Sequence, residues 1–261
     1  MKMIKTHRDR SSQENFLTLL QSIPVRHAML SHTYYADRWA RGQLTLEGMQ
    51  LYCLQNRGEQ LFQEALCVLK GRSIMRPAIN GVIEQNLLDE IGHMELWLTF
   101  TAGVGLKAKD IAYAPMLPAT KGLNEIFQYF TYRAKNLWES VGALFAFEAQ
   151  MPAISEAKLE ALDCHYASFF QNFTVASEYY EVHREADKKH AAWWLQLFEE
   201  HCLALDDRKA ALRGAYNMAT ALVDLLEGIH RADKTHRTMD IAFLAQRFSA
   251  ATYQQPIAIN A

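Results

Sequence analysis

The sequence is poor in the residues that interrupt helices, with only 12 glycines and 6 prolines among 261 positions. It also has few runs of β-branched residues, the side chains that strands favour. Both absences argue against a β-sheet protein. Half of the residues are apolar, which is ample for a buried core in a chain of this length. The composition therefore predicts an all-α fold.

Further absences exclude several classes of function. Acidic residues (29) slightly outnumber Lys and Arg (27) and no basic run occurs, so we expect no nucleic-acid partner. No stretch of about 18 uncharged apolar residues is present, which argues against a membrane-spanning helix. The four cysteines form no CxxC pair, and we predict structural thiols, with Cys53 and Cys67 buried. Residues 1–10 lack the apolar run of a signal peptide, so the expected location is cytoplasmic.

Prolines, glycines and capping residues divide the chain into seven or eight predicted helices. We expect one helical domain over residues 1–261, with a core from about 13 to 232 and frayed termini. Thr45 is a predicted N-cap, Pro24 should stop the first helix, and Pro152 should kink a later one. Residues 107–118 and 169–173 are expected to be irregular. The predicted helices span residues 11–21, 27–41, 46–70, 77–101, 121–134, 137–162, 177–203 and about 207–231.

Two of these helices carry acids or histidines in positions that suggest metal binding. Glu90 and His93 form a Glu-x-x-His pair, which a continuous helix would place one turn apart on the same side. Glu148 is the only charged residue between Ser140 and Ser155. A carboxylate in such apolar surroundings costs several kcal/mol unless it is paired, protonated or bound to a cation. The alternative for each is an ordinary acid or histidine at the surface.

The strongest pattern lies in the segment 177–203. His183, Asp187 and His190 are spaced i, i+4 and i+7, which places them within about 40° of one another around a helix. Together with the first three residues they supply three carboxylates and three histidines, the ligand content of a carboxylate-bridged dinuclear iron site. The alternative is an exposed polar stripe, but the neighbouring charged residues fall on the other side of the helix: Arg184, Glu185, Lys188 and Lys189.

Other histidines are weaker candidates. Glu227 and His230 form a second Glu-x-x-His pair, but Gly228 lies inside it and its neighbourhood is charged. His27 and His32 could line a pocket, although a structural role is expected for each. The remaining histidines carry no partner pattern and are expected at the surface: His7, His165, His201 and His236.

The order of these residues resembles the haem-oxygenase-like diiron oxidases, which share the fold of the TenA and PqqC proteins. Within that group the chain is similar to the CADD-like family, which supplies p-aminobenzoate for folate synthesis and is understood to excise one of its own tyrosines as the ring source. The resemblance covers roughly residues 27–226 and is concentrated in the stretches 32–45, 86–90, 148–152 and 183–190. It implies a haem-oxygenase-like bundle that holds two iron ions, or iron and manganese, and uses dioxygen and an external reductant.

The resemblance also implies roles for three further residues. It places the sacrificial tyrosine at Tyr35, a second tyrosine of the family at Tyr52, and the lysine implicated as amino donor at Lys158. On the residues alone, each has an ordinary explanation as a packed tyrosine or a solvated lysine. The chain departs from CADD at Phe147, where CADD has a tyrosine, and in the spacing of Glu90 and His93. Two residues separate this pair, as in the fatty-acid decarboxylase UndA, whereas six separate it in CADD.

These patterns leave three functional hypotheses. The favoured one is a CADD-like p-aminobenzoate synthase that consumes Tyr35 and turns over about once. The second is an UndA-like oxidase of a free fatty acid or amino acid, with a tunnel lined by residues such as Leu61, Phe62 and Phe145. The third is a non-catalytic protein-interaction module. The substrate is thus an internal tyrosine or a small molecule, and a homodimer is expected because it is common in this fold.

Overall fold

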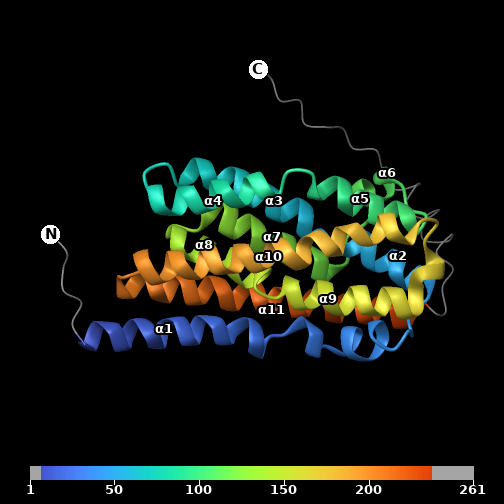
Figure 1. Ribbon diagram of the computed structural model, residues 1–261, viewed down its shortest axis with the longest axis horizontal. Helices are drawn as coiled ribbons and strands as arrows, with labels where there is room; N and C mark the ends of the chain where they lie inside the picture. Colours follow the sequence, from blue (N-terminus) through green and yellow to red (C-terminus); the bar gives the residue numbers. More distant parts are fainter. Residues whose placement is uncertain (1–6, 237–261) are drawn as a thin grey trace, which may run out of the picture.

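The computed structural model describes residues 7–236, and every regular element within them is helical. The all-α prediction is therefore confirmed. Two long helices near the C-terminal end, α10 (Phe173–His201) and α11 (Leu205–His236), run along the length of the bundle (Figure 1). The shorter helix α8 (Leu137–Glu148) contacts both of them, and α9 (Met151–Ala161) packs along α10. This central group positions most of the polar residues discussed below.

The approach of α8 to α11 is unusually close because each helix presents a glycine at the crossing. A Cβ atom added to Gly142 would collide with the carbonyl group of Ala211, and one added to Gly214 would collide with the carbonyl group of Glu139. Only glycine leaves room for this backbone contact. The contact fixes α8, and with it Glu148 at the end of that helix.

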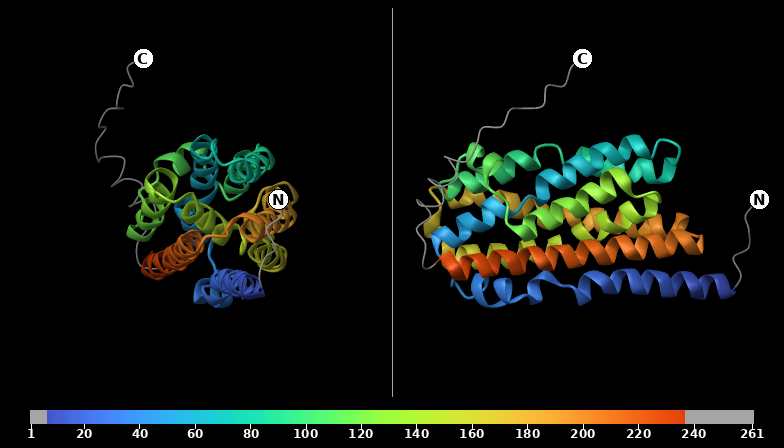
Figure 2. Two further views of the ribbon diagram at one scale, coloured as in Figure 1. Left: turned by 90° about the vertical axis from the view of Figure 1, so that its left-hand side faces the viewer. Right: turned by 180° about the vertical axis from the view of Figure 1, so that it is seen from behind.

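The remaining helices surround this group (Figure 2). Helix α1 (His7–Arg26) lies against α11, and the pair α3 (Gly58–Arg72) and α4 (Pro77–Asp89) packs side by side at the opposite side of the bundle. The other α-helices are α2 (Leu46–Gln55), α5 (His93–Gly103), α6 (Ala108–Tyr113) and α7 (Pro118–Gln128). Short π-helical segments span Tyr34–Trp39, Tyr129–Arg133 and Leu162–Tyr166, and 3₁₀ turns span Met29–Ser31 and Ala167–Phe169.

Three helices predicted as continuous are each broken into two. The predicted helix 46–70 stops at Gln55, because Asn56 is extended, and a new helix begins at Gly58, whose backbone amide donates to the Asn56 side chain. The predicted helix 77–101 is interrupted at Gly92, whose φ of 95° lies in the left-handed region that glycine adopts more readily than other residues. The predicted helix 137–162 ends at Glu148, and Pro152 lies in the first turn of α9 rather than kinking one helix. The structure therefore has more helices than the seven or eight predicted.

Several other expectations need correction. Helix α1 runs through Pro24 to Arg26, because a proline so close to the end removes only a last-turn bond. Residues 27–41 form the 3₁₀ and π segments rather than one α-helix, and residues 107–118 include α6. The predicted irregular segment 169–173 is confirmed up to residue 172, as the end of a 3₁₀ turn followed by a short linker. Helix α10 begins at Phe173, with Asn172 as its N-cap, and so starts earlier than the predicted residue 177. The Thr45 cap is confirmed by its bond from the Gly48 amide at 3.1 Å.

The structure tests the predicted burial of two cysteines and part of the predicted chain termini. Cys53 is buried as predicted, but Cys67 is exposed because it lies on the outer side of α3. None of the helices within residues 7–236 is long and apolar enough to cross a membrane. The predicted frayed termini fall mostly outside the described residues, as do the side chains of His7 and His236.

Candidate metal centre

Acids and histidines from five helices meet as two buried groups that share Glu90. Within each group the candidate ligand atoms lie within 4.8 Å of one another. The first group consists of Glu59, Glu90, His93 and His183, and the second consists of Glu90, Glu148, Asp187 and His190. All six predicted metal ligands are brought together in this way, and Glu59 is added to them.

Helix α10 contributes three of the candidate ligands from one face. His183, Asp187 and His190 are buried, as the spacing of four and three residues predicts for a helix. Their charged neighbours point away: Arg184 is half-buried, and Glu185, Lys188 and Lys189 are exposed. The stripe is therefore not a solvated polar face.

Glu90 and His93 meet for a different reason than predicted. Glu90 caps the C-terminal end of α4, His93 is the first residue of α5, and the turn through Gly92 joins them. His93 Nδ1 lies 2.8 Å from Glu90 Oε2. The contact arises from a turn between two helices rather than from one helical face, and this turn allows Glu90 to reach both groups.

Glu148 is almost fully enclosed, with 1 % of its surface exposed. The Asn86 amide donates to both of its carboxylate oxygens at 3.0 and 3.1 Å, the Trp194 indole N–H donates to Oε2, and His190 Nδ1 lies 2.8 Å from Oε1. Nearby, Asp187 Oδ2 is buried and has no hydrogen-bond partner. A buried acceptor without a partner is costly, and a cation at this position would satisfy it.

Burial and mutual contact shift the pKa values of these groups strongly. Burial raises the pKa of Glu148 to about 7, although the bond with His190 opposes the shift. Burial also acts against protonation of His190, but its bonds to Asp187 and Glu148 outweigh burial and raise its pKa to about 11. In the same way Glu59 and Asp187 raise the pKa of His183 to about 9 despite burial. The shifts favour protons on these groups when no metal is bound, so metal binding should release protons.

The charges of the two groups suit two divalent cations. The four acids carry four negative charges when ionised, and the three histidines supply neutral nitrogen donors. Two divalent ions would balance those charges in a site where unbalanced charge is expensive. Mixed carboxylate and imidazole ligands are those of iron and manganese sites, whereas structural zinc sites more often use four ligands that include cysteine. The donor set therefore fits the expected iron, or iron and manganese, centre.

Glu59 was missed by reasoning from the sequence because no histidine follows it at helical spacing. It lies in the first turn of α3 and is buried, 3.2 Å from His183 Nε2. Tyr179 donates its hydroxyl to Glu59 at 3.2 Å, and Gln63 donates its amide at 2.8 Å. A signal was present: Glu59 continues the buried stripe of Phe62, Leu66 and Leu69 on α3.

A second polar cluster lies beside the first, and it brings together the three residues that the resemblance selected. The Tyr35 and Tyr52 hydroxyls are 3.4 Å apart, Lys158 Nζ donates to the Tyr52 hydroxyl, and Lys158 Nζ lies 3.2 Å from the Tyr180 hydroxyl. Lys158 is only 2 % exposed, not solvated as its charged neighbourhood suggested. Lys158 Nζ also lies 4.9 Å from the centroid of the Trp39 ring.

The surroundings of Lys158 favour its neutral form. Burial lowers the pKa of Lys158 well below its ordinary value, and the nearby Cys53 thiol opposes this shift only in part. The same burial raises the pKa of Tyr35 and of Tyr52 well above that of a free phenol. Burial in this cluster therefore favours the uncharged forms of the amine and of the phenols.

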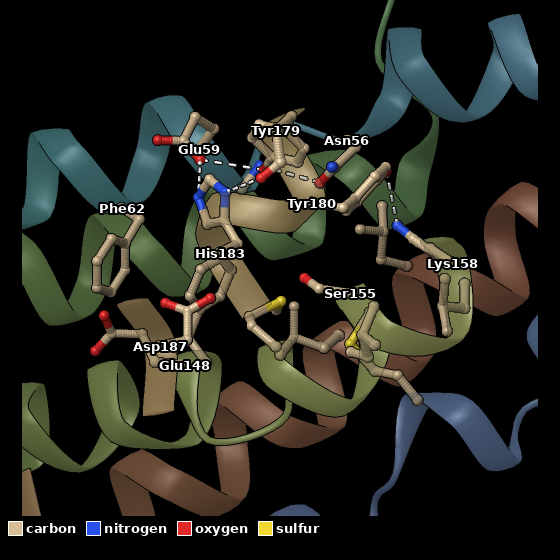
Figure 3. A pocket seen from close by; sticks show the side chains of 18 of the residues that line it. Asn56, Glu59, Phe62, Glu148, Ser155, Lys158, Tyr179, Tyr180, His183 and Asp187 are labelled. Carbon is tan, nitrogen blue, oxygen red and sulfur yellow. Dashed lines mark hydrogen bonds and ion pairs between the residues drawn. The ribbon is translucent and has the colours of Figure 1, made fainter. Parts of the chain in front are cut away.

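One internal cavity of about 50 Å³ connects the two clusters. Its lining includes Glu59, Glu90, Glu148, Tyr35 and Lys158. Figure 3 shows Glu148 and Asp187 at one end of this pocket and Lys158 at the other, with Ser155 between them. Of the three tunnel residues suggested for a free fatty acid, only Phe62 lines the cavity; Leu61 and Phe145 are packed elsewhere in the core, and Phe147 lines it instead.

Comparison with known proteins assigns the family. A family model described as iron-containing redox enzyme, of the haem-oxygenase type, matches residues 50–223. The chain belongs to this family. Similar curated proteins are the 4-aminobenzoate synthases of Chlamydia trachomatis serovar D (28 % identical, covering 82 % of this chain and 91 % of that protein) and of Nitrosomonas europaea (26 % identical, covering 80 % and 87 %).

Solved structures confirm the fold of this iron-containing redox enzyme. A haem-oxygenase-like domain of unknown function from Shewanella denitrificans is 15 % identical, with a TM-score of 0.66 over 88 % of this chain and 95 % of that one. A TenA homologue from Pseudomonas syringae is 13 % identical, with a TM-score of 0.65 over 85 % and 92 %. Both predictions, of the haem-oxygenase-like fold and of a redox enzyme, are therefore confirmed.

The second Glu-x-x-His pair does not join either group. Glu227 lies 3.2 Å from His32 and also pairs with Arg231, and His230 packs its ring against Tyr34. His32 is therefore a partner of Glu227 rather than a ligand. As expected, His165 and His201 are exposed.

Proposed function

We propose that this iron-containing redox enzyme is a p-aminobenzoate (4-aminobenzoate) synthase that takes the aromatic ring of its product from its own Tyr35. The observation that carries the proposal is the shared cavity: Tyr35, Lys158 and the candidate metal ligands line one enclosed space. The similar curated synthases support the same reaction. Tyr52 and Tyr180 complete the pocket around the amine.

The enclosure of Tyr35 is what a sacrificial residue requires. Its ring is 3 % exposed, so an oxidised ring would be kept from bulk water and from outside nucleophiles. Tyr52 faces its hydroxyl at 3.4 Å and can exchange a proton with it. The residue is held by the π-helical segment Tyr34–Trp39, an element that is frequent at functional sites.

Lys158 is suited to supply nitrogen. Its lowered pKa favours the free amine, whose lone pair is available for reaction, whereas an ammonium has none. The tyrosine hydroxyls hold the amine in place, and no carboxylate within residues 7–236 pairs with it to keep it protonated. No other lysine lines the cavity among the described residues.

The two buried groups would hold the metal ions, iron alone or iron with manganese. Bound there, the ions would supply the electrons and coordination sites with which dioxygen is reduced, and an external reductant would be needed to begin. The chain itself orients the acids: Asn86 and Trp194 hold Glu148, while Tyr179 and Gln63 hold Glu59. Fixed carboxylates lower the reorganisation that metal binding requires.

The small volume argues against a free fatty acid as substrate. Pockets for small molecules usually measure about 300–1,000 Å³. The cavity of about 50 Å³ has room for small species such as water but not for a fatty acid. The Tyr35 ring already forms part of its wall and would need no further space as a substrate. A non-catalytic role leaves the seven clustered ligands and the buried amine unexplained.

The test is product analysis after a single oxygen exposure. The chain, grown with ¹⁵N-labelled lysine, is loaded with ferrous iron without oxygen, with and without added Mn²⁺, and then exposed to air and a reductant. We expect p-aminobenzoate carrying ¹⁵N, in an amount close to one per chain, and a peptide mass loss at Tyr35.

A matched pair of variants controls the experiment. Tyr35→Phe should form no product, while Tyr216→Phe, at an exposed tyrosine, should behave as the parent chain. Product from Tyr35→Phe would contradict the proposal. If Tyr35 is consumed but the product carries no ¹⁵N, the role of Lys158 as nitrogen donor is contradicted, while the role of Tyr35 stands.

Two further expectations stay predictions. We propose that the protein acts in the cytoplasm, which the four free thiols support because such compartments keep cysteines reduced. We also propose a homodimer, which sedimentation of the purified chain would test. A monomer would contradict it without affecting the reaction.

A further inference from the structure

Asp89 lies beside His190 of the second ligand group. It is the last residue of α4, directly before Glu90, and its side chain is 35 % exposed. Its Oδ2 atom lies 3.4 Å from Nε2 of His190, a residue with no exposed side-chain surface. Asp89 is not a member of either ligand group.

The two nitrogens of His190 face opposite partners. Nδ1 points into the second group, 2.8 Å from Glu148, 3.5 Å from Asp187 and 3.7 Å from Glu90. A metal ion among these acids would therefore bind Nδ1. Nε2 would then carry the proton and donate it towards Asp89.

His183 shows the same arrangement with the nitrogens exchanged. Its Nε2 faces Glu59 at 3.2 Å, while its Nδ1 lies 2.6 Å from the backbone carbonyl of Tyr179. In both histidines the ring nitrogen that points away from the ligand group faces an oxygen acceptor. For His183 the backbone provides that acceptor, whereas for His190 a side chain provides it and can be replaced.

Helix stability does not explain Asp89. The C-terminal end of a helix carries partial negative charge, so an acid there is unfavourable. Here Asp89 and the capping Glu90 both lie at that end of α4. The contact that favours an acid at this position is therefore the one with His190.

We infer that Asp89 is a positioning residue for the metal centre: it holds the proton of His190 on Nε2 and directs Nδ1 at the metal. This role rests on the metal centre of the proposed function, but not on its substrate. Loss of an outer partner of this kind commonly weakens metal binding by about 10–100-fold. The effect should fall on one metal position, because His190 belongs to only one of the two groups.

The test is an oxygen-free titration of the metal-free full chain with Mn²⁺. Electron paramagnetic resonance measures the concentration of unbound Mn²⁺ at each step. We expect two bound ions in the parent chain. Asp89→Asn should weaken one of them by about 10–100-fold, and Asp89→Glu should restore much of the loss. Glu84→Gln, at an exposed acid on the same helix that pairs with Lys70, should bind as the parent does.

A second measurement separates positioning from a structural role. Thermal unfolding of the metal-free chains should show one cooperative transition for Asp89→Asn and for Asp89→Glu, so that a difference in their Mn²⁺ affinity does not come from loss of the fold. Unchanged Mn²⁺ affinities in Asp89→Asn, or loss of its cooperative transition together with no rescue by Asp89→Glu, would overturn the inference. A parent chain that binds no Mn²⁺ would overturn it together with the metal centre, whereas failure to form p-aminobenzoate would leave it intact.

Discussion

Replacing Lys158 by methionine should make the metal-free protein more stable while it abolishes p-aminobenzoate formation. Methionine has a similar length and no charge, and it can occupy the space among the rings of Trp39, Tyr52 and Tyr180. The Tyr52 hydroxyl would keep its contacts with Tyr35 and Asn56. Burying a polar group with incomplete compensation costs about 1–3 kcal/mol, which is the expected gain in the free energy of unfolding near pH 10, where the amine loses its proton in the unfolded chain as well.

The gain should depend on pH, and its sign follows from the lowered pKa of Lys158. In the unfolded chain this lysine binds a proton below about pH 10.4, whereas in the folded chain it does so only at much lower pH. Between those two values the unfolded state holds more protons, so lowering the pH destabilises the wild-type protein by up to about 1.4 kcal/mol per unit. Methionine has no such dependence. The advantage of Lys158→Met should therefore be largest at the lower pH and shrink as the pH rises towards 10.

Urea unfolding of both metal-free chains at pH 7, 8 and 9 measures this difference. Lys121→Met, at an exposed lysine, is the control and should change the free energy of unfolding by less than about 0.5 kcal/mol at each pH. A Lys158→Met chain that is less stable than the wild type, or more stable by the same amount at every pH, would refute the assignment of a buried neutral amine.

Three further predictions concern the centre and its support. Mn²⁺ at about 100 times its dissociation constant should stabilise the chain by about 2.7 kcal/mol per site, raising the unfolding midpoint by roughly 5–11 °C per site; an unchanged midpoint would count against the site. Glu59→Gln should weaken one of two bound Mn²⁺ ions more than tenfold, whereas the exposed control Glu95→Gln should not; equal binding in both would remove Glu59 from the ligands. Gly142→Ala should destabilise the fold by at least about 1–3 kcal/mol through collision with α11, while Gly81→Ala, in an open part of α4, should stabilise it by about 0.4–1 kcal/mol; chemical denaturation of both variants decides.

The parts of the site that the sequence predicts well are those contained in one helix. His183, Asp187 and His190 share a face because helical periodicity alone places them there. Glu148 is visible because an isolated acid in an apolar helix needs a partner. The partners themselves, Asn86 and Trp194, come from α4 and α10, and their positions depend on tertiary packing that spacing does not encode.

The parts that were missed depend on contacts between distant elements. Glu59 reaches the centre because α3 begins anew at Gly58, after a turn in which the Asn56 side chain accepts from the Gly58 amide. Lys158 is buried although Glu156 and Glu160 beside it are exposed, because it shares a helix face with the buried Ile154. Here the three- and four-residue spacing to apolar neighbours was a better guide than the charge of adjacent residues.

The turn through Gly92 has a consequence for how related sequences are compared. Two ligands on one helical face must keep a spacing of three or four residues, and an insertion between them would rotate one away. Glu90 and His93 are instead joined by a turn between helix ends, where extra residues can be accommodated as a longer loop. The distance along the chain between this acid and this histidine is thus free to drift during evolution. It is a poor marker of which substrate a member of the family uses.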